Sequence, residues 1–139
     1  MILLDTNVLS EVLKPVPDAR VIDWLDAQDD DTWTSAISEA EMLAGVAVVP
    51  GGRRREGLIQ ATRAMFAKEF AGRILSFNTD SARAYADIVA TRRRARPPIY
   101  QSDAMIAAMA LTCSATVATR NVSDFTGLGF EVVNPWTVG

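Results

Sequence analysis

The 139-residue chain contains no histidine, a single cysteine and only two lysines. Without histidine it has no Ser-His-Asp triad, no imidazole general base and no histidine ligand for a metal. Its one cysteine, Cys113, excludes an internal disulfide and a thiolate zinc site, and its alanine-rich surroundings favour a small core residue. A metal site in this chain must therefore use oxygen ligands, which suit Mg²⁺ and Mn²⁺.

Long apolar runs are also absent from the sequence. No run approaches the roughly 20 residues that span a membrane, and the N-terminus lacks the basic segment and apolar core of a signal peptide. Apolar residues make up 49% of the chain and charged residues 22%, which is typical of a folded soluble domain. We therefore expect a single domain over residues 1–139, located in the cytoplasm.

The charged residues are unevenly distributed, although the net charge is only −3. Acidic residues cluster at 26–31, and arginines cluster at 53–55 and at 92–94 with Arg96. Arginine suits bidentate phosphate contacts, so both arginine runs are candidates for binding a nucleic-acid backbone. Taken alone, each run is better explained as a solvated helix face or a protein-docking surface.

Short apolar segments alternate with helical patterns along the whole chain. Strands are predicted at residues 2–5, 32–35, 74–77, 116–118 and 131–133. Helices are predicted at residues 7–13, 18–27, 38–48, 53–70, 79–94 and 102–112, with a short turn at 123–125 and Thr79 as a helix cap. This alternation predicts an α/β fold with a short parallel sheet of about five strands, flanked by helices.

Acidic residues follow the predicted strands. Asp5 ends the first strand, Glu41 lies in the first turn of the helix after the second, and Asp103 opens the alanine-rich helix. Asp124 follows the fourth strand, with Asn121 beside it. In open parallel α/β sheets, ligands bind at this edge.

Several of these acids also have a simple structural explanation. Residues 38–41 match a capping box, residues 121–124 have a similar spacing, and the helix dipole favours Asp103 at a helix start. Asp5 fits a cap least well, because the two residues after it could cap the next helix. Four acids on one edge would repel one another without a base among them. A divalent cation would relieve that repulsion, so the pattern favours a metal site.

Four stretches of the chain resemble the successive motifs of PIN-domain ribonucleases: MILLDTNVLSE, SAISEAEMLAGV, YQSDAMIAAMA and TVATRNVSDFTGLGFEVVNPW. The resemblance is narrower still to the VapC-type toxins of bacterial toxin–antitoxin modules, including their FitB-like branch. It covers nearly the whole chain in the right order, and the motifs together are specific, although DTN alone is weak. It implies the PIN-like three-layer fold.

The resemblance also implies which residues form the site. The acidic positions of the family match Asp5, Glu41 and Asp103. The fourth motif usually begins with an acid where this chain has Asn121, so the fourth acid, if one is used, is expected to be Asp124. Because Asn121 carries no charge, a second tightly held metal is in doubt, and Asn121 is expected only to orient ligands or water.

Supporting residues and partners follow from the same resemblance. Thr6 and Asn7 match family positions that support the carboxylates by hydrogen bonding, and Arg120 either approaches a phosphate or pairs with a nearby acid. The family implies a small DNA-binding antitoxin as a partner and a homodimer as the oligomeric state.

The expected activity is that of a Mg²⁺- or Mn²⁺-dependent endoribonuclease. Asp5 and Asp103 would hold the principal metal, with Glu41 and Asp124 completing the shell directly or through water, and Glu41 or Asp124 accepting a proton from water. One alternative is a metal-dependent nuclease acting on structured DNA, and another is a PIN-like binding module without activity. An aspartyl phosphatase is weaker, because Asn7 stands where its second aspartate is needed.

Overall fold

A five-stranded parallel sheet forms the centre of the computed structural model, which describes residues 1–29, 31–95 and 98–138. The strand order is β3-β2-β1-β4-β5, and every neighbouring pair is parallel. The strands are β1 (Ile2–Leu4), β2 (Thr32–Ser35), β3 (Ile74–Leu75), β4 (Thr116–Ala118) and β5 (Val132–Val133). The predicted α/β fold with a parallel sheet of about five strands is confirmed.

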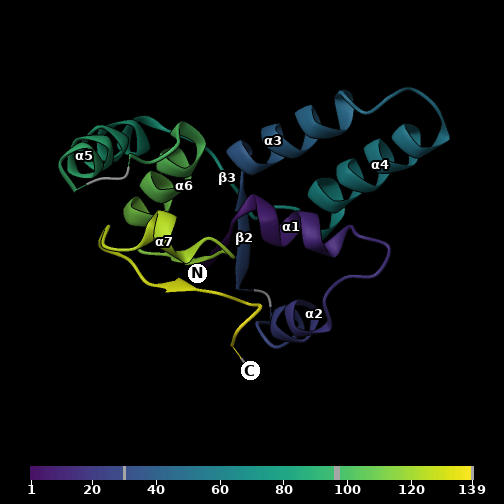
Figure 1. Cartoon of the computed structure of the whole chain (residues 1–139), viewed down its shortest axis with the longest axis horizontal. Coiled ribbons are helices and arrows are strands. Elements are labelled where there is room, and N and C mark those ends of the chain that lie inside the picture. Colours follow the sequence, from purple (N-terminus) through teal and green to yellow (C-terminus); the bar gives the residue numbers. More distant parts are fainter. Residues whose placement is uncertain (30, 96–97, 139) are drawn as a thin grey trace.

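Helices surround the sheet (Figure 1). They are α1 (Thr6–Val12), α2 (Ala19–Asp26), α3 (Ala36–Ala47), α4 (Arg53–Ala64), α5 (Thr79–Ala95), α6 (Gln101–Thr112) and α7 (Val122–Phe125). The predicted helix at 53–70 instead changes after α4 into a π-helical turn, η1 (Met65–Glu69), and the turn at 123–125 is the short helix α7. Helices α5 and α6 pack together, as do α3 and α4.

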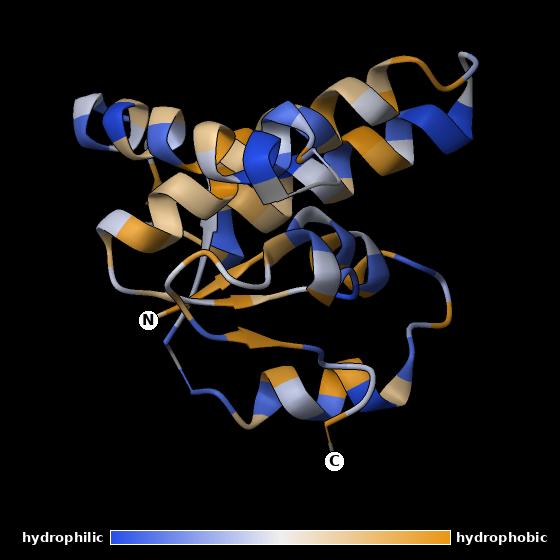
Figure 2. Ribbon diagram, turned by 60° about the vertical axis from the view of Figure 1, so that its left-hand side comes forward, coloured by the Kyte–Doolittle hydropathy of each residue, from blue (hydrophilic) through white to orange (hydrophobic). Residues whose placement is uncertain are grey.

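Successive side chains of strand β1 point to opposite faces of the sheet, and helices cover both faces, so both sets of side chains are buried. Leu3 joins one core, in which it packs with the alanine-rich α6 and with Val117 of β4. Leu4 joins the other core, which contains Leu9 of α1 and Phe66 of η1. Figure 2 shows these apolar strands between the helices. Two cores on opposite faces of one sheet give the three layers that were expected.

The capping box considered for residues 38–41 does not form, and the predicted cap at Thr79 is wrong. Ser38 does not cap α3; the helix begins earlier, and Ser35 at the end of β2 accepts a hydrogen bond from the Ser38 N–H at 3.1 Å. Thr79 is the first residue of α5, and the Asn78 side chain accepts from the Ser81 N–H at 3.0 Å. In both places the polar residue that ends the extended segment takes the capping position.

The helices are short or carry many polar residues. Among the residues that the structure describes, none of the helices is both long enough and apolar enough to cross a bilayer.

The α6 core contacts lead to a stability prediction. Ile106→Ala removes a fully buried side chain and should lower the free energy of unfolding by about 2–5 kcal/mol, through lost burial and a residual cavity. Urea denaturation measures the change. Val48→Ala is the control, because Val48 is 83% exposed and its truncation should stay within about 0.5 kcal/mol. Equal losses in the two variants would contradict the assigned core.

Candidate active site

Asp5 lies where β1 gives way to α1. Its backbone N–H still donates to the Ala118 carbonyl of β4 at 2.9 Å, as a strand residue would. Its Oδ1 accepts from the Thr6 N–H at 2.8 Å, so Asp5 itself is the N-cap of α1. The expectation that Asp5 fits a cap poorly was therefore wrong. The carboxylate is only 5% exposed and needs further hydrogen-bond donors.

Thr119, directly after β4, supplies one of those donors. Its buried hydroxyl donates to Asp5 Oδ2 at 2.8 Å and accepts from Asn7 Nδ2 at 3.2 Å and from the Asn121 N–H at 3.0 Å. Asn7 Nδ2 also lies 3.4 Å from Asp5 Oδ2, and Asn7 Oδ1 accepts from the Arg120 N–H at 3.3 Å. This network ties the start of α1 to the end of β4 and restricts the orientation of the Asp5 carboxylate.

Sequence reasoning did not single out Thr119, although it stands inside the fourth quoted motif. The register of the sheet accounts for its position. Leu4 pairs with Ala118, so the residues that follow them, Asp5 and Thr119, lie side by side at the edge of the sheet. A threonine at that position can offer its hydroxyl to a buried aspartate.

Glu41 reaches the same edge from α3. Thr6 Oγ1 donates to Glu41 Oε1 at 2.8 Å and lies 2.9 Å from Ser38 Oγ. A hydroxyl carries one proton and two lone pairs, so Thr6 can donate to Glu41 while accepting from Ser38. Glu41 is therefore held by Thr6 and does not act in the capping box that residues 38–41 suggested. Its side chain remains exposed.

Asp103 occupies the first turn of α6 and is half-buried. Burial raises its pKa to about 6, and the negative charges of Asp5, Asp124 and Glu41 add to the effect, while Arg92 opposes it. Burial also raises the pKa of Asp5, although hydrogen bonds from Thr119 and Thr6 work against that rise. The predicted acids thus lie close enough to repel one another.

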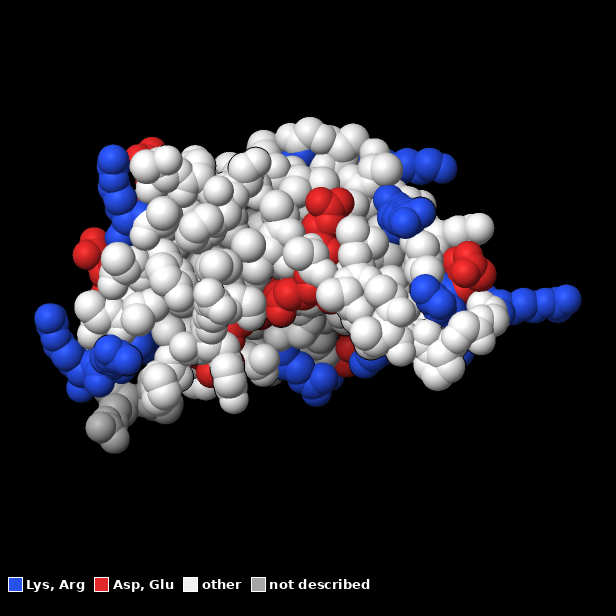
Figure 3. All heavy atoms as spheres, turned by 90° about the horizontal axis from the view of Figure 1, so that it is seen from above, with Lys and Arg blue, Asp and Glu red and all other residues white. Residues whose placement is uncertain are grey.

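A pocket of about 430 Å³ opens at this edge of the sheet. Its lining includes the predicted residues Asp5, Thr6, Asn7, Glu41, Asp103, Arg120 and Asn121. Asp124, in α7, acts on Asp5 and Asp103 through its charge but does not line the pocket. Viewed from above, acidic side chains are visible near the middle of the molecule as well as at its ends, and most of the visible basic side chains lie toward the ends (Figure 3).

Arg120 lies at the rim of this pocket. Its guanidinium carbon is 5.2 Å from the centre of the Trp136 ring, a cation–π arrangement that limits where the side chain can go. Hydrogen bonds from Arg20 hold the pKa of Asp18 at about 2, and the charge of Arg120 contributes to that low value. Arg120 thus lines the pocket and lies near enough to Asp18 for its charge to act there, and its approach to a phosphate stays a prediction.

The arginine runs divide between solvent and protein interior. Arg53 and Arg54 are exposed on α4, whereas Arg92 is buried and donates to backbone carbonyls near α7. The prediction that all of 92–94 faces phosphate or solvent is wrong for Arg92. Arg96 lies outside the described residues.

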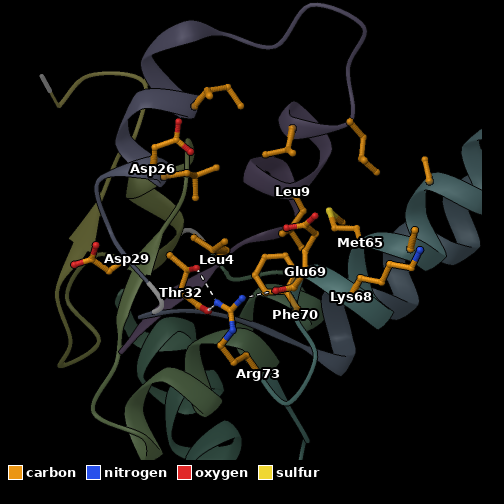
Figure 4. Close-up of a pocket in the computed structure, with 16 residues that line it drawn as sticks. Leu4, Leu9, Asp26, Asp29, Thr32, Met65, Lys68, Glu69, Phe70 and Arg73 are labelled. Carbon is orange, nitrogen blue, oxygen red and sulfur yellow. Dashed lines mark hydrogen bonds between the residues drawn. The ribbon is translucent and has the colours of Figure 1, made fainter.

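A second cavity, of about 530 Å³, lies between α1, α2, α4 and η1 (Figure 4). Apolar side chains such as Leu9 and Phe70 line much of it, and Arg73 crosses one side to donate to the carbonyls of Thr32 and Glu69. None of the predicted site residues lines this cavity. The chemistry of the chain is therefore concentrated in the acidic pocket.

The donor set of the acidic pocket fits a divalent cation. Across residues 1–29, 31–95 and 98–138, no three Asp, Glu or Cys side chains already form a cluster that could hold a metal. Mg²⁺ does not require one, since it usually binds through one or two carboxylates and keeps several waters. The pKa of Asp103 is raised first by burial and then by the charge of Asp5, and a cation between the two carboxylates would offset that repulsion.

The PIN domain family profile matches residues 2–128. The chain belongs to the PIN domain family. Its relatives include the plasmid stability protein StbB of Pseudomonas syringae pv. tomato, at 44% identity over 98% of this chain and 99% of StbB. The VapC ribonuclease Y4jK of Sinorhizobium fredii is 41% identical over 98% of both chains, and toxin FitB of Neisseria gonorrhoeae is 42% identical over 98% and 99%.

A solved structure confirms the relationship at the level of the fold. FitAB bound to an IR36 DNA fragment contains a chain that superimposes on this PIN domain with a TM-score of 0.92 and 41% identity. The match covers 100% of this chain and 98% of that one. The resemblance to the VapC and FitB toxins, first drawn from four short motifs, thus extends over the entire fold.

The raised pKa of Asp103 predicts that its charge destabilises the metal-free fold. Between its usual value of 3.8 and about 6, the folded protein binds more protons than the unfolded chain, so stability falls as the pH rises through this window. Asp103→Asn should therefore raise the free energy of unfolding, by at most ~3 kcal/mol near pH 7.5 and by little near pH 4. Urea denaturation in EDTA at both pH values measures this. An equal effect at both would contradict the charge argument.

Thr119 and Thr34 form a matched pair for testing the hydroxyl network. Thr119→Val removes the donor to Asp5 and should cost about 1.5–3 kcal/mol of stability near neutral pH, as expected for a hydrogen bond to a charged group. Thr34 is equally buried, and its hydroxyl has no partner among the described residues, so Thr34→Val should be neutral or stabilising. Chemical denaturation of both variants gives the comparison; a loss in Thr34→Val as large as that in Thr119→Val would be evidence against the network.

Proposed function

We propose that this PIN domain is a Mg²⁺- or Mn²⁺-dependent endoribonuclease and the toxin component of a type II toxin–antitoxin system. The observation that carries the proposal is the gathering of Asp5, Glu41 and Asp103 in one pocket, with Asp124 close enough to act on them. The similarity to the VapC ribonuclease Y4jK and to toxin FitB supports the choice of RNA and the toxin role.

Asp5 and Asp103 are the residues that would hold the metal. When bound, a divalent ion there would lower the pKa of a coordinated water and stabilise charge on a phosphodiester. Thr119 and the Thr6 N–H each hold one oxygen of Asp5, so its carboxylate is oriented before any ligand arrives. Such supporting groups tune a metal ligand without touching the metal.

Glu41 is the favoured proton acceptor. It is exposed at the pocket, and its Oε1 accepts a hydrogen bond from Thr6 at the start of α1. A carboxylate within reach of the pocket is a suitable general base for a water molecule. Asp124 contributes negative charge from outside the pocket, and Asn121 lines the pocket without charge.

We also propose a small DNA-binding antitoxin as the partner of this chain. Solved structures similar to it are described as FitAB bound to an IR36 DNA fragment and FitAcB from Neisseria gonorrhoeae. The acidic pocket of this chain would attract a basic side chain of a protein as well as a metal, so an antitoxin could act directly at the site. A homodimer remains a prediction.

The test of the proposed activity is cleavage of a pooled RNA substrate. Asp5→Asn keeps a side chain that can cap α1 but removes the charge, and should lower metal-dependent cleavage by more than ~100-fold, since residues that merely support a metal ligand are worth about 10–100-fold. The assay compares Mg²⁺, Mn²⁺ and EDTA.

Asp23→Asn is the matched control, because Asp23 is an exposed aspartate of α2 away from the pocket. It should cleave RNA at the wild-type rate. Full activity of Asp5→Asn would remove Asp5 from the site. Cleavage of structured DNA but not of RNA would replace the substrate in the proposal, and metal binding without any cleavage would favour an inactive binding module.

A further inference from the structure

Arg92 is a buried cation next to the acidic pocket. It lies in the last two turns of α5, is 8% exposed, and its neighbours Arg93 and Arg94 are exposed. Its Nη2 donates to the carbonyl of Asp124 at 2.6 Å, with the carbonyls of Thr126 at 3.2 Å and Ser123 at 3.4 Å. Because the side chain is buried and its Nη2 is engaged by backbone carbonyls, Arg92 is poorly placed to bind a phosphate.

The helix that Arg92 reaches is too short to be stable alone. Helix α7 has only 4 residues, and its N-cap, Asn121, makes no side-chain capping bond. The last carbonyls of a helix have no partner within it, and a cation near that end is favoured by the helix dipole. Arg92 supplies both donors and charge from another helix, so it caps the C-terminal end of α7 from outside.

Asp124 belongs to this short helix. Its own carbonyl accepts the shortest of the three bonds, while its carboxylate charge acts on Asp5 and Asp103. Helix α6, which carries Asp103, packs against both α5 and α7. Moving α7 would therefore change where the Asp124 charge lies relative to Asp103.

We propose that Arg92 is a positioning residue that holds α7, and with it the Asp124 carboxylate, against the acidic pocket, and that it does not contact RNA. The inference rests on the proposed nuclease function, because it assigns Asp124 a part in that site. It also separates Arg92 from the two arginines beside it, which stay available to solvent and to a nucleic-acid backbone.

Three substitutions on α5 separate positioning from RNA contact. Arg92→Ala should lower kcat by about 10–100-fold with KM for RNA within about twofold, as expected for a displaced but intact site. Arg83→Ala is the matched control, since Arg83 is an exposed arginine of the same helix whose removal should change neither parameter. Arg93→Ala is the comparator for a backbone contact and is expected to raise KM if that residue meets phosphate.

The salt dependence of RNA binding gives an independent readout. Losing one phosphate contact to a single strand reduces the slope of log K against log salt by about 0.7. Arg92→Ala should leave that slope unchanged. Millimolar guanidinium ion should restore part of the lost kcat of Arg92→Ala, whereas sodium chloride at the same ionic strength should not, because only guanidinium can replace the donors to the three carbonyls.

Two measurements without RNA complete the test. Hydrogen exchange of the amides at 122–126 should accelerate in Arg92→Ala and stay at the wild-type rate in Arg83→Ala. Mn²⁺ binding by calorimetry should weaken in Arg92→Ala and not in Arg83→Ala, against the opposite effect of removing the Arg92 charge, which acts on Asp103. If Arg92→Ala does not fold, Arg92→Gln retains one amide donor and is measured in the same way.

The possible outcomes lead to different conclusions. Wild-type kcat in Arg92→Ala, or a reduced salt slope, would overturn the positioning role while leaving the nuclease proposal intact. Wild-type protein that cleaves no RNA with any metal would instead overturn the proposed function. In that case the exchange and Mn²⁺ measurements would still decide whether Arg92 holds α7: unchanged exchange would refute it.

Discussion

The buried carboxylate of Asp5 is the constraint on which the rest of the site depends. A charge at 5% exposure is costly unless donors surround it, and this one is met by the Thr6 N–H, the Thr119 hydroxyl and, at longer range, the Asn7 amide. Two of those donors lie in the first turn of α1, directly after β1, and one lies directly after β4. The parallel pairing of Leu4 with Ala118 places the residues that follow β1 next to those that follow β4. The register of the sheet therefore determines which donors reach Asp5.

The same edge also gathers charges that destabilise one another. Asp5 and Asp103 lie at the N-terminal ends of α1 and α6, where the helix dipoles favour negative charge by a few tenths to about 1 kcal/mol each. That compensation is smaller than the effect of burial, and the pKa values of both acids remain raised. The free energy of the metal-free fold is therefore raised by these acids, which is the arrangement expected where charged groups serve binding or catalysis.

Local pattern predicted much of this arrangement, and distant contacts account for what it missed. Strands β2 and β4 have the predicted bounds, because alternation and flanking turns are local signals. Asp5 was expected to fit a cap poorly, but pairing with β4 keeps its backbone extended, which is the conformation of an N-cap. Thr119 was not identified from the sequence, because it lies 114 residues away from Asp5 in the chain. The capping box at residues 38–41, one of the explanations left open for Glu41, does not form, because α3 begins directly after β2 and Ser35 takes the capping position. These errors all arise where tertiary pairing overrides a short motif.

The arginine run on α5 shows how periodicity refines a charge pattern. Successive helix residues turn by about 100°, so three adjacent arginines cannot all face the same way. Ser81, Ile88 and Arg92 are the buried residues among 79–94, the part of this helix whose burial is described, and their spacing of seven and four follows one face. An arginine on that inward stripe must find acceptors inside the protein. A four-residue helix with unpaired carbonyls beside the acidic pocket provides them, and this explains why one arginine of the run is buried while its neighbours meet solvent.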